Sequence, residues 1–248
     1  MTKGKLLTTV AAAAAAAGWL AGPASASELE LAPAQWSWAG HYFGDHAGWA
    51  WGDVDVSEKA VYNGSPTWGY DVDGFSGGAQ VGYNWQWGSL VFGPIIELGY
   101  RGLDGSATDP ASPGLDTTSS LDSSFFIATS SRVGFALNNF LFYARGGVLY
   151  ADMDVKVVDT CTTRACGGGV VDASNSGFEL AWTVGGGVEY GFVGWSGHRW
   201  SLKGEYIYAD FGSIDAKGTA GGALAGTKTR WSHDVQAHIV NAGVNFFF

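Results

Sequence analysis

The chain has 248 residues, of which 39 are glycine, 15% are aromatic and only 15% are charged, and its formal net charge is −10 at pH 7. This composition is typical of one β-rich domain. The acidity argues against a nucleic-acid partner, and it leaves no polybasic patch for an anionic membrane surface.

The first 26 residues have the three parts of a secretory signal peptide. Lys3 and Lys5 form a positive start, an apolar, alanine-rich stretch covers 6–20, and residues 24–26 (Ala-Ser-Ala) supply a small-residue cleavage site. A segment of this kind is removed on export. No other stretch approaches the roughly 18 apolar residues that a membrane-spanning helix needs. If the exported chain spans a membrane, it must therefore do so as a β-barrel.

The mature chain is expected to begin near Ser27. Residues 27–37 look like a short periplasmic lead-in, in which Pro33 blocks regular structure. The remainder, 38–248, is predicted to be one barrel domain. Apolar and polar residues alternate there in segments of about ten residues, the length of a tilted membrane-spanning strand.

Eight strands are predicted from this alternation: 38–51, 75–87, 90–101, 124–137, 140–153, 178–192, 199–211 and 237–248. The gaps after the second, fourth and sixth strands are short. Those at 52–74, 102–123, 154–177 and 212–236 are long and rich in Gly, Ser, Thr and Asp. The fold class is therefore all-β: an eight-stranded antiparallel transmembrane β-barrel with short periplasmic turns and long extracellular loops.

Each strand presents one apolar and one polar face. In the sixth strand, Leu180, Trp182 and Val184 share one side, with Thr183 and Glu189 on the other. The apolar side is expected to face lipid. Several tryptophans fall near periplasmic strand ends, where an interfacial aromatic girdle belongs: Trp36, Trp38, Trp85, Trp87, Trp195 and Trp200.

The first strand does not fit this pattern. Placing Phe43 and Trp49 outward also turns Asp45 toward lipid, which is unfavourable. Either a β-bulge near Gly44 redirects the chain, or the register differs there.

Alternation also turns six charged side chains into the lumen: Glu97, Arg132, Arg145, Glu189, Lys203 and Glu205. An eight-stranded barrel is just wide enough for side chains to fill it. Unpaired buried charges are costly, so these groups are expected to form hydrogen-bonded ion pairs in one band. We interpret the band as a polar plug; a gated, narrow ion path is the alternative.

Other candidate sites have less support. Cys161 and Cys166 form a close pair that an oxidising compartment would convert to a disulfide. The trios at 41, 45 and 46 and at 233, 234 and 238 contain His and Asp but lack a metal-ligand or hydrolase spacing, and the set 232–234 (Ser-His-Asp) has no confirming geometry. No catalytic residue, metal or cofactor is predicted.

The chain ends in a strand whose outward residues are apolar, with Val244, Phe246 and Phe248 on one side. Four places resemble the small OmpA-like, opacity-porin-type outer-membrane proteins, often labelled "porin family": WAGHYFG at 38–44 with GWAWG at 48–52; GAQVGYNWQ at 78–86; WTVGGGVEY at 182–190 with KGEYIYADFG at 203–212; and GVNFFF at 243–248. The resemblance is absent from the long loops.

This resemblance implies a barrel of the Gram-negative outer membrane that contributes to envelope integrity and surface display. The partners expected are outer-membrane lipid and lipopolysaccharide, together with the barrel-assembly machinery and periplasmic chaperones during biogenesis. The assembly machinery would read Val244, Phe246 and Phe248. Two alternatives to the structural role stay open: a narrow diffusion pore gated by the interior charges, and a ligand- or host-binding protein that acts through its loops.

Overall fold

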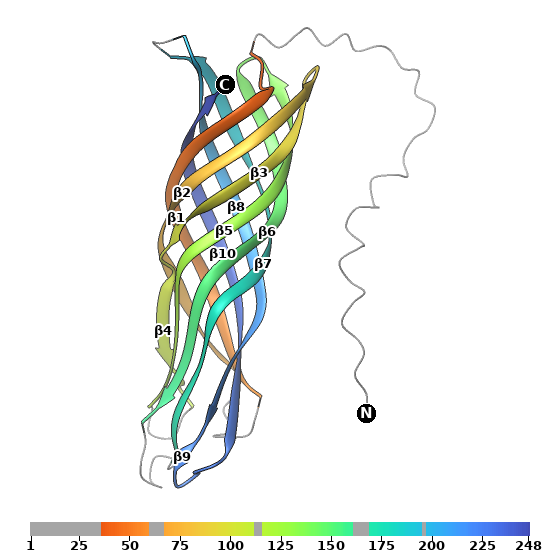
Figure 1. Cartoon of the computed structure of the whole chain (residues 1–248). Helices are drawn as coiled ribbons and strands as arrows, with labels where there is room; N and C mark the ends of the chain where they lie inside the picture. Colours follow the sequence, from red (N-terminus) through yellow and green to blue (C-terminus); the bar gives the residue numbers. More distant parts are fainter. Residues whose placement is uncertain (1–35, 60–66, 112–115, 161–168, 195–196) are drawn as a thin grey trace, which may run out of the picture. The chain divides into compact units, whose positions relative to one another are not determined.

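The barrel consists of long antiparallel strands closed into a ring (Figure 1). The computed structural model describes residues 36–59, 67–111, 116–160, 169–194 and 197–248. The strands are β1 (Gly40–Glu58), β2 (Trp68–Trp87), β3 (Leu90–Arg101), β4 (Asp104–Thr108), β5 (Thr117–Leu137), β6 (Phe140–Asp159), β7 (Gly169–Val193), β8 (Arg199–Thr219), β9 (Gly221–Gly222) and β10 (Lys228–Phe247). Among these residues no helix is long and apolar enough to cross a membrane.

Pairing between the first and last long strands closes the barrel. β1 pairs with β10 along one edge and with β2 along the other. β4 continues β3 after a break at Gly102, and it also lies between β2 and β5. β9 is a two-residue strand against the start of β7. With β3 and β4 counted as one strand and the two-residue β9 left out, the ring has the eight strands predicted from the sequence.

The two ends of the barrel differ. The short connections between β2 and β3 and between β5 and β6 lie at one end, here called the turn end, where Gly88 and Asn138 adopt positive φ (58° and 52°). Tight hairpins need this conformation, which Gly and Asn tolerate. At the opposite end, here called the loop end, β1, β4, β6 and β8 finish and β2, β5, β7 and β10 begin.

The prediction of long loops was wrong over most of their length. The strands are 19 to 25 residues long apart from β3, β4 and β9, so most of 52–74, 102–123, 154–177 and 212–236 is β-sheet. These segments do alternate, as in Asp53-Val54-Asp55-Val56. Their many Asp, Ser and Gly residues led to a loop assignment, whereas the cross-strand pairing continues through them.

The chemical sense of the alternation reverses along β1 and β2. On β2 the outward residues Phe75 and Val81 are apolar and the inward Gln80 is polar; nearer the loop end, Asp73 points outward and Val72 is fully buried. The outward apolar stretch from Phe75 to Trp85 has the length a tilted strand needs to cross a bilayer, about 9–11 residues. The lipid-facing wall thus ends near Phe75, and a water-facing wall continues beyond it.

The interior follows the same reversal. In the loop half, apolar side chains fill the barrel and form one buried cluster that includes Trp68, Val157, Ile214 and Trp231. In the turn half, buried polar and charged residues line the interior. At the turn end a second apolar cluster contains Trp36, Trp38, Tyr42 and Phe247.

Two girdle residues were therefore misassigned. Trp36 and Trp38 are 4% and 0% exposed and pack edge-on against Phe247 inside the barrel, with ring centroids 6.4 and 5.9 Å away. The chain just before β1 folds under the barrel and buries both indoles. Trp85 and Trp87 do face outward, Trp200 is half-buried, and Trp195 lies outside the described residues.

Neither explanation offered for the first strand holds. The pairing of β1 with both neighbours is continuous through Gly44, with Asp45 opposite Val244 and Ala79. Asp45 is exposed on the lipid-facing wall. The structure offers no physical account of this carboxylate.

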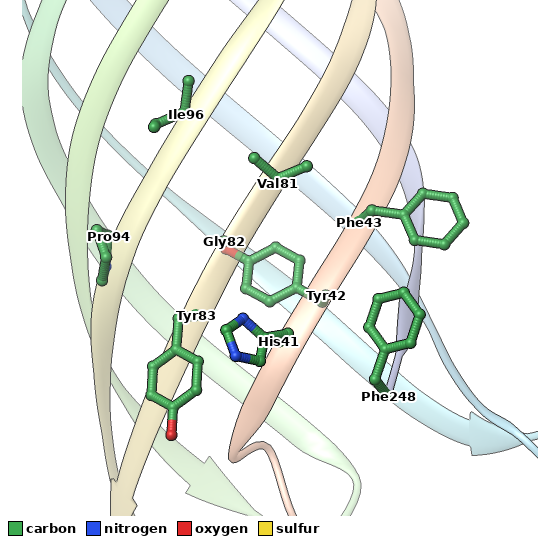
Figure 2. Close-up of a pocket in the computed structure, with 9 residues that line it drawn as sticks. All are labelled: His41, Tyr42, Phe43, Val81, Gly82, Tyr83, Pro94, Ile96 and Phe248. Carbon is green, nitrogen blue, oxygen red and sulfur yellow. The ribbon is translucent and has the colours of Figure 1, made fainter.

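The outer wall is hollowed near the turn end. A groove with a volume of about 590 Å³ lies there. Figure 2 shows its lining, in which the short side chains of Val81 and Pro94 lie among larger neighbours such as Phe43, Tyr83 and Phe248. Its lining is almost wholly apolar, as expected for a surface that contacts lipid chains.

Adjacent valines in β6 test the reversed interior. Val157 is fully buried in the loop-half cluster, whereas Val158 is 36% exposed on the outer face. Val157→Asp is expected to lower the free energy of unfolding by about 3 kcal/mol or more, because it buries a carboxylate in an apolar core. Val158→Asp should have little effect. Urea unfolding followed by tryptophan fluorescence measures both; equal losses would contradict the filled interior.

Candidate functional site

Buried charges in the turn half of the lumen form the candidate site. Six side chains meet in the lumen because each occupies an inward position of its strand. They come from five neighbouring strands: Glu97 (β3), Arg132 (β5), Arg145 (β6), Glu189 (β7), Lys203 and Glu205 (β8). Each is at most 5% exposed. The structure thus brings together all the lumen charges singled out from the sequence.

Arg145 lies between two carboxylates. Its Nη1 donates to Glu205 Oε1 at 2.8 Å and to Glu97 Oε1 at 3.2 Å, and its Nη2 donates to Glu97 Oε2 and to Ser130 Oγ. One guanidinium thereby links β3, β6 and β8 across the lumen. Its planar set of N–H donors suits this bridging role better than a lysine would.

A second ion pair joins Arg132 to Glu189. Arg132 Nη1 donates to Glu189 Oε2 at 2.8 Å, and Arg132 Nε donates to Asn84 Oδ1 at 3.1 Å. Glu189 Oε1 accepts from Ser201 Oγ and from Asn245 Nδ2. The Arg132 guanidinium also lies 4.7 Å from the ring centre of Tyr42 and 5.2 Å from that of Tyr143, within cation–π range.

Lys203 and Tyr143 complete the network. Lys203 Nζ donates to Gln80 Oε1 at 2.6 Å and lies 3.7 Å from Glu205 Oε1. The Tyr143 hydroxyl donates to Glu205 Oε2 at 2.7 Å. Together with the two arginine pairs, these contacts give every carboxylate oxygen of Glu97, Glu189 and Glu205 a donor.

One charge beside the predicted network was missed. Arg101 is 3% exposed at the end of β3, where its guanidinium lies 4.4 Å from the ring centre of Phe126. Arg101 lies an even number of residues after Glu97 on the same strand, so both side chains point to the same face. Alternation alone could therefore have identified it. Its position next to a predicted loop concealed it.

The His and Asp trios do not assemble into sites. His233 points into the barrel, whereas its neighbour Asp234 points outward, and His46 and Asp45 diverge in the same way. His233 lies in the loop half beyond the lipid-facing wall, and its Nε2 is 2.9 Å from Ser119 Oγ. Burial there lowers the pKa of His233 to about 4, so the ring is neutral at pH 7.

The chain terminus has the two faces expected of it. Val244, Phe246 and Phe248 face outward, whereas Phe247 is 2% exposed inside the turn end. Arg199 Nη2 donates to the carbonyl oxygen of Phe248 at 2.7 Å, which ties the terminus to β8. Cys161 and Cys166 lie outside the described residues.

Removal of Arg145 tests the energetic role of the network. Arg145→Met leaves Glu97 and Glu205 without their principal cation, so the free energy of unfolding should fall by about 3–5 kcal/mol. The matched control is Arg230→Met, which removes an exposed ion pair with Asp215 and should leave the urea midpoint unchanged. Equal urea midpoints for both variants would show that the lumen network does not stabilise the fold.

Comparisons with known proteins agree with this architecture. A family model described as "Outer membrane protein beta-barrel domain" matches residues 6–248. A 22 kDa outer membrane protein of Rhizobium leguminosarum bv. viciae is 33% identical over 77% of this chain and 72% of its own. A 31 kDa outer-membrane immunogenic protein of Brucella melitensis is 28% identical over 86% of this chain and 84% of its own.

Among solved structures, OprG from Pseudomonas aeruginosa is 15% identical, with a TM-score of 0.48 over 87% of this chain and 100% of its own. Neisserial surface protein A is 17% identical, with a TM-score of 0.39 over 85% of this chain and 98% of its own. The family model and the Rhizobium relative, together with the closed ring of strands, decide the assignment. The chain belongs to the outer membrane protein β-barrel domain family and resides in the bacterial outer membrane.

Proposed function

We propose that this protein is a non-enzymatic structural and surface component of the outer membrane, with a lumen closed by its own side chains. The observation that carries the proposal is the succession of layers along the lumen. An aromatic cluster lies at the turn end, the ion-pair network lies next to it on the side of the loop end, and apolar side chains fill the loop half.

The ion-pair network supports a plug. Its carboxylates and cations bond to one another across the lumen, and they are almost inaccessible to solvent. Ions crossing this band would have to displace bonds between paired buried charges, which is costly. The apolar cluster in the loop half adds a barrier of a different kind, because an ion there would lose its hydration without gaining polar partners.

The loop half supports a surface role. In the usual outer-membrane topology the short turns face the periplasm, so the loop half projects outside the cell. Its outer wall exposes aspartates on β-strands, among them Asp53, Asp71, Asp73 and Asp122. The Brucella relatives are named immunogenic proteins. A display surface of this kind would also serve the ligand-binding alternative.

The partners follow from the same surfaces. The apolar outer wall suits outer-membrane lipid and lipopolysaccharide. The end of β10 suits capture by the barrel-assembly machinery after delivery by periplasmic chaperones, because three apolar residues face outward there: Val244, Phe246 and Phe248. An export signal at residues 1–26 and a loop disulfide between Cys161 and Cys166 complete the proposal, and both lie outside the described residues.

Single-channel recording in a planar bilayer tests the closed lumen. The folded protein should carry no steady current, and Glu97→Ala or Arg132→Ala should not open a path, because the apolar cluster still blocks the loop half. Folding of each variant is checked by its heat-modifiable migration on gels. Steady current in the wild type that either substitution enlarges would favour the gated-pore alternative and contradict the plug.

A further inference from the structure

Arg101 is a buried cation that makes no ion pair with a carboxylate among the described residues. Its Nε donates to Ser76 Oγ at 3.4 Å, a long hydrogen bond, and its guanidinium stacks on Phe126. Its Nη1 has no hydrogen-bond partner among the described residues, although the residue is only 3% exposed. A buried charge left in this state destabilises the folded protein unless something neutralises it.

The neighbouring carboxylates are already engaged. Glu97, the acid nearest to Arg101 along β3, is held by both Nη atoms of Arg145. Glu189 and Glu205 likewise have a donor on each oxygen. In the turn half of the lumen, Arg101, Arg132, Arg145 and Lys203 face Glu97, Glu189 and Glu205, which leaves one positive charge in excess.

A small cavity lies beside Arg101. Its volume is about 10 Å³, room for about one water-sized particle. Arg101, Arg145, His46 and Asn241 contribute to its lining, and each has a buried polar atom without a hydrogen-bond partner among the described residues: Arg101 Nη1, Arg145 Nε, His46 Nδ1 and Asn241 Oδ1.

The chemistry of this set favours a negatively charged guest. The two arginines can only donate hydrogen bonds, and a neutral imidazole donates from one ring nitrogen. A 180° rotation of the Asn241 amide presents its NH₂ group to the cavity. The one carboxylate in the lining, Glu97, is turned to Arg145 by two hydrogen bonds. Two arginine donors therefore face a space for one small particle, and the His46 ring and the Asn241 amide can each present a further donor to it.

We propose that this cavity binds a small monovalent anion, with chloride as the physiological candidate, which neutralises Arg101 inside the barrel. The anion would be a structural part of the folded protein. This inference goes beyond the proposed function, because the lumen can be closed with or without an anion.

Urea unfolding of the purified protein in detergent micelles tests the proposal. Chloride replaces gluconate at constant ionic strength, so that general screening stays fixed. Bound chloride stabilises only the folded state. At a chloride concentration ten times the dissociation constant, the ratio of unfolded to folded protein should therefore be about elevenfold lower than in gluconate alone. Bromide should act similarly.

Arg101→Met should abolish the chloride dependence while the barrel still folds, because the substitution removes the uncompensated charge and keeps an apolar stem against Phe126. Arg230→Gln is the matched control: it removes an arginine that is half exposed at the loop end, and it should keep the full chloride response.

Crystals soaked in bromide give a readout that does not depend on any variant. An anomalous peak within hydrogen-bond distance of Arg101 Nη1 is expected. Water alone in the cavity would give no anomalous peak and no halide dependence of unfolding at constant ionic strength, and that result would overturn the proposal. A halide response that persists in Arg101→Met would overturn it as well.

Discussion

The structure depends on one constraint: a β-strand alternates its side chains with a period of two, and it keeps that phase unless a bulge intervenes. The strands of this barrel pass from lipid into water, so the same outward positions must change from apolar to polar on the way. On β1 and β2 the sequence meets this requirement by reversing its pattern, whereas β5 and β8 contain register shifts. On the outer face of β1, the apolar residues Trp49 and Trp51 give way to Asp53 and Asp55 toward the loop end. On its inner face, polar His46 gives way to apolar Val54 and Val56.

The reversal determines what the lumen can contain. Where the outer wall is apolar, the interior is polar, and an eight-stranded barrel leaves little room for water among the side chains. Charges buried there must satisfy one another, which explains why Arg145 bridges two glutamates and why Arg132 combines an ion pair with two aromatic faces. Where the outer wall is polar, most of the interior side chains are apolar and form one cluster.

Much of this was predictable from the sequence, and the failures have physical causes. Alternation identified the barrel and the inward positions of Glu97, Arg145 and Glu205, because side-chain direction is a local property of a strand. It failed where composition outweighed it: Asp53 to Val56 alternates but was read as loop, and Arg101 was overlooked beside such a segment. Trp36 and Trp38 were misplaced because local pattern cannot show that the preceding chain folds under the barrel. The outward position of Asp45 has no explanation in either the sequence or the structure.

Spin labels along the outer face of β2 test the reversal most directly. Single labels at positions 81, 75, 73 and 71 follow the outward residues Val81, Phe75, Asp73 and Asp71 in a protein reconstituted into lipid. Labels at 81 and 75 should be more accessible to oxygen, which partitions into the bilayer, and labels at 73 and 71 should be more accessible to a water-soluble nickel complex. A lipid-like profile that continues through position 71, or a water-like profile at 75, would contradict the account.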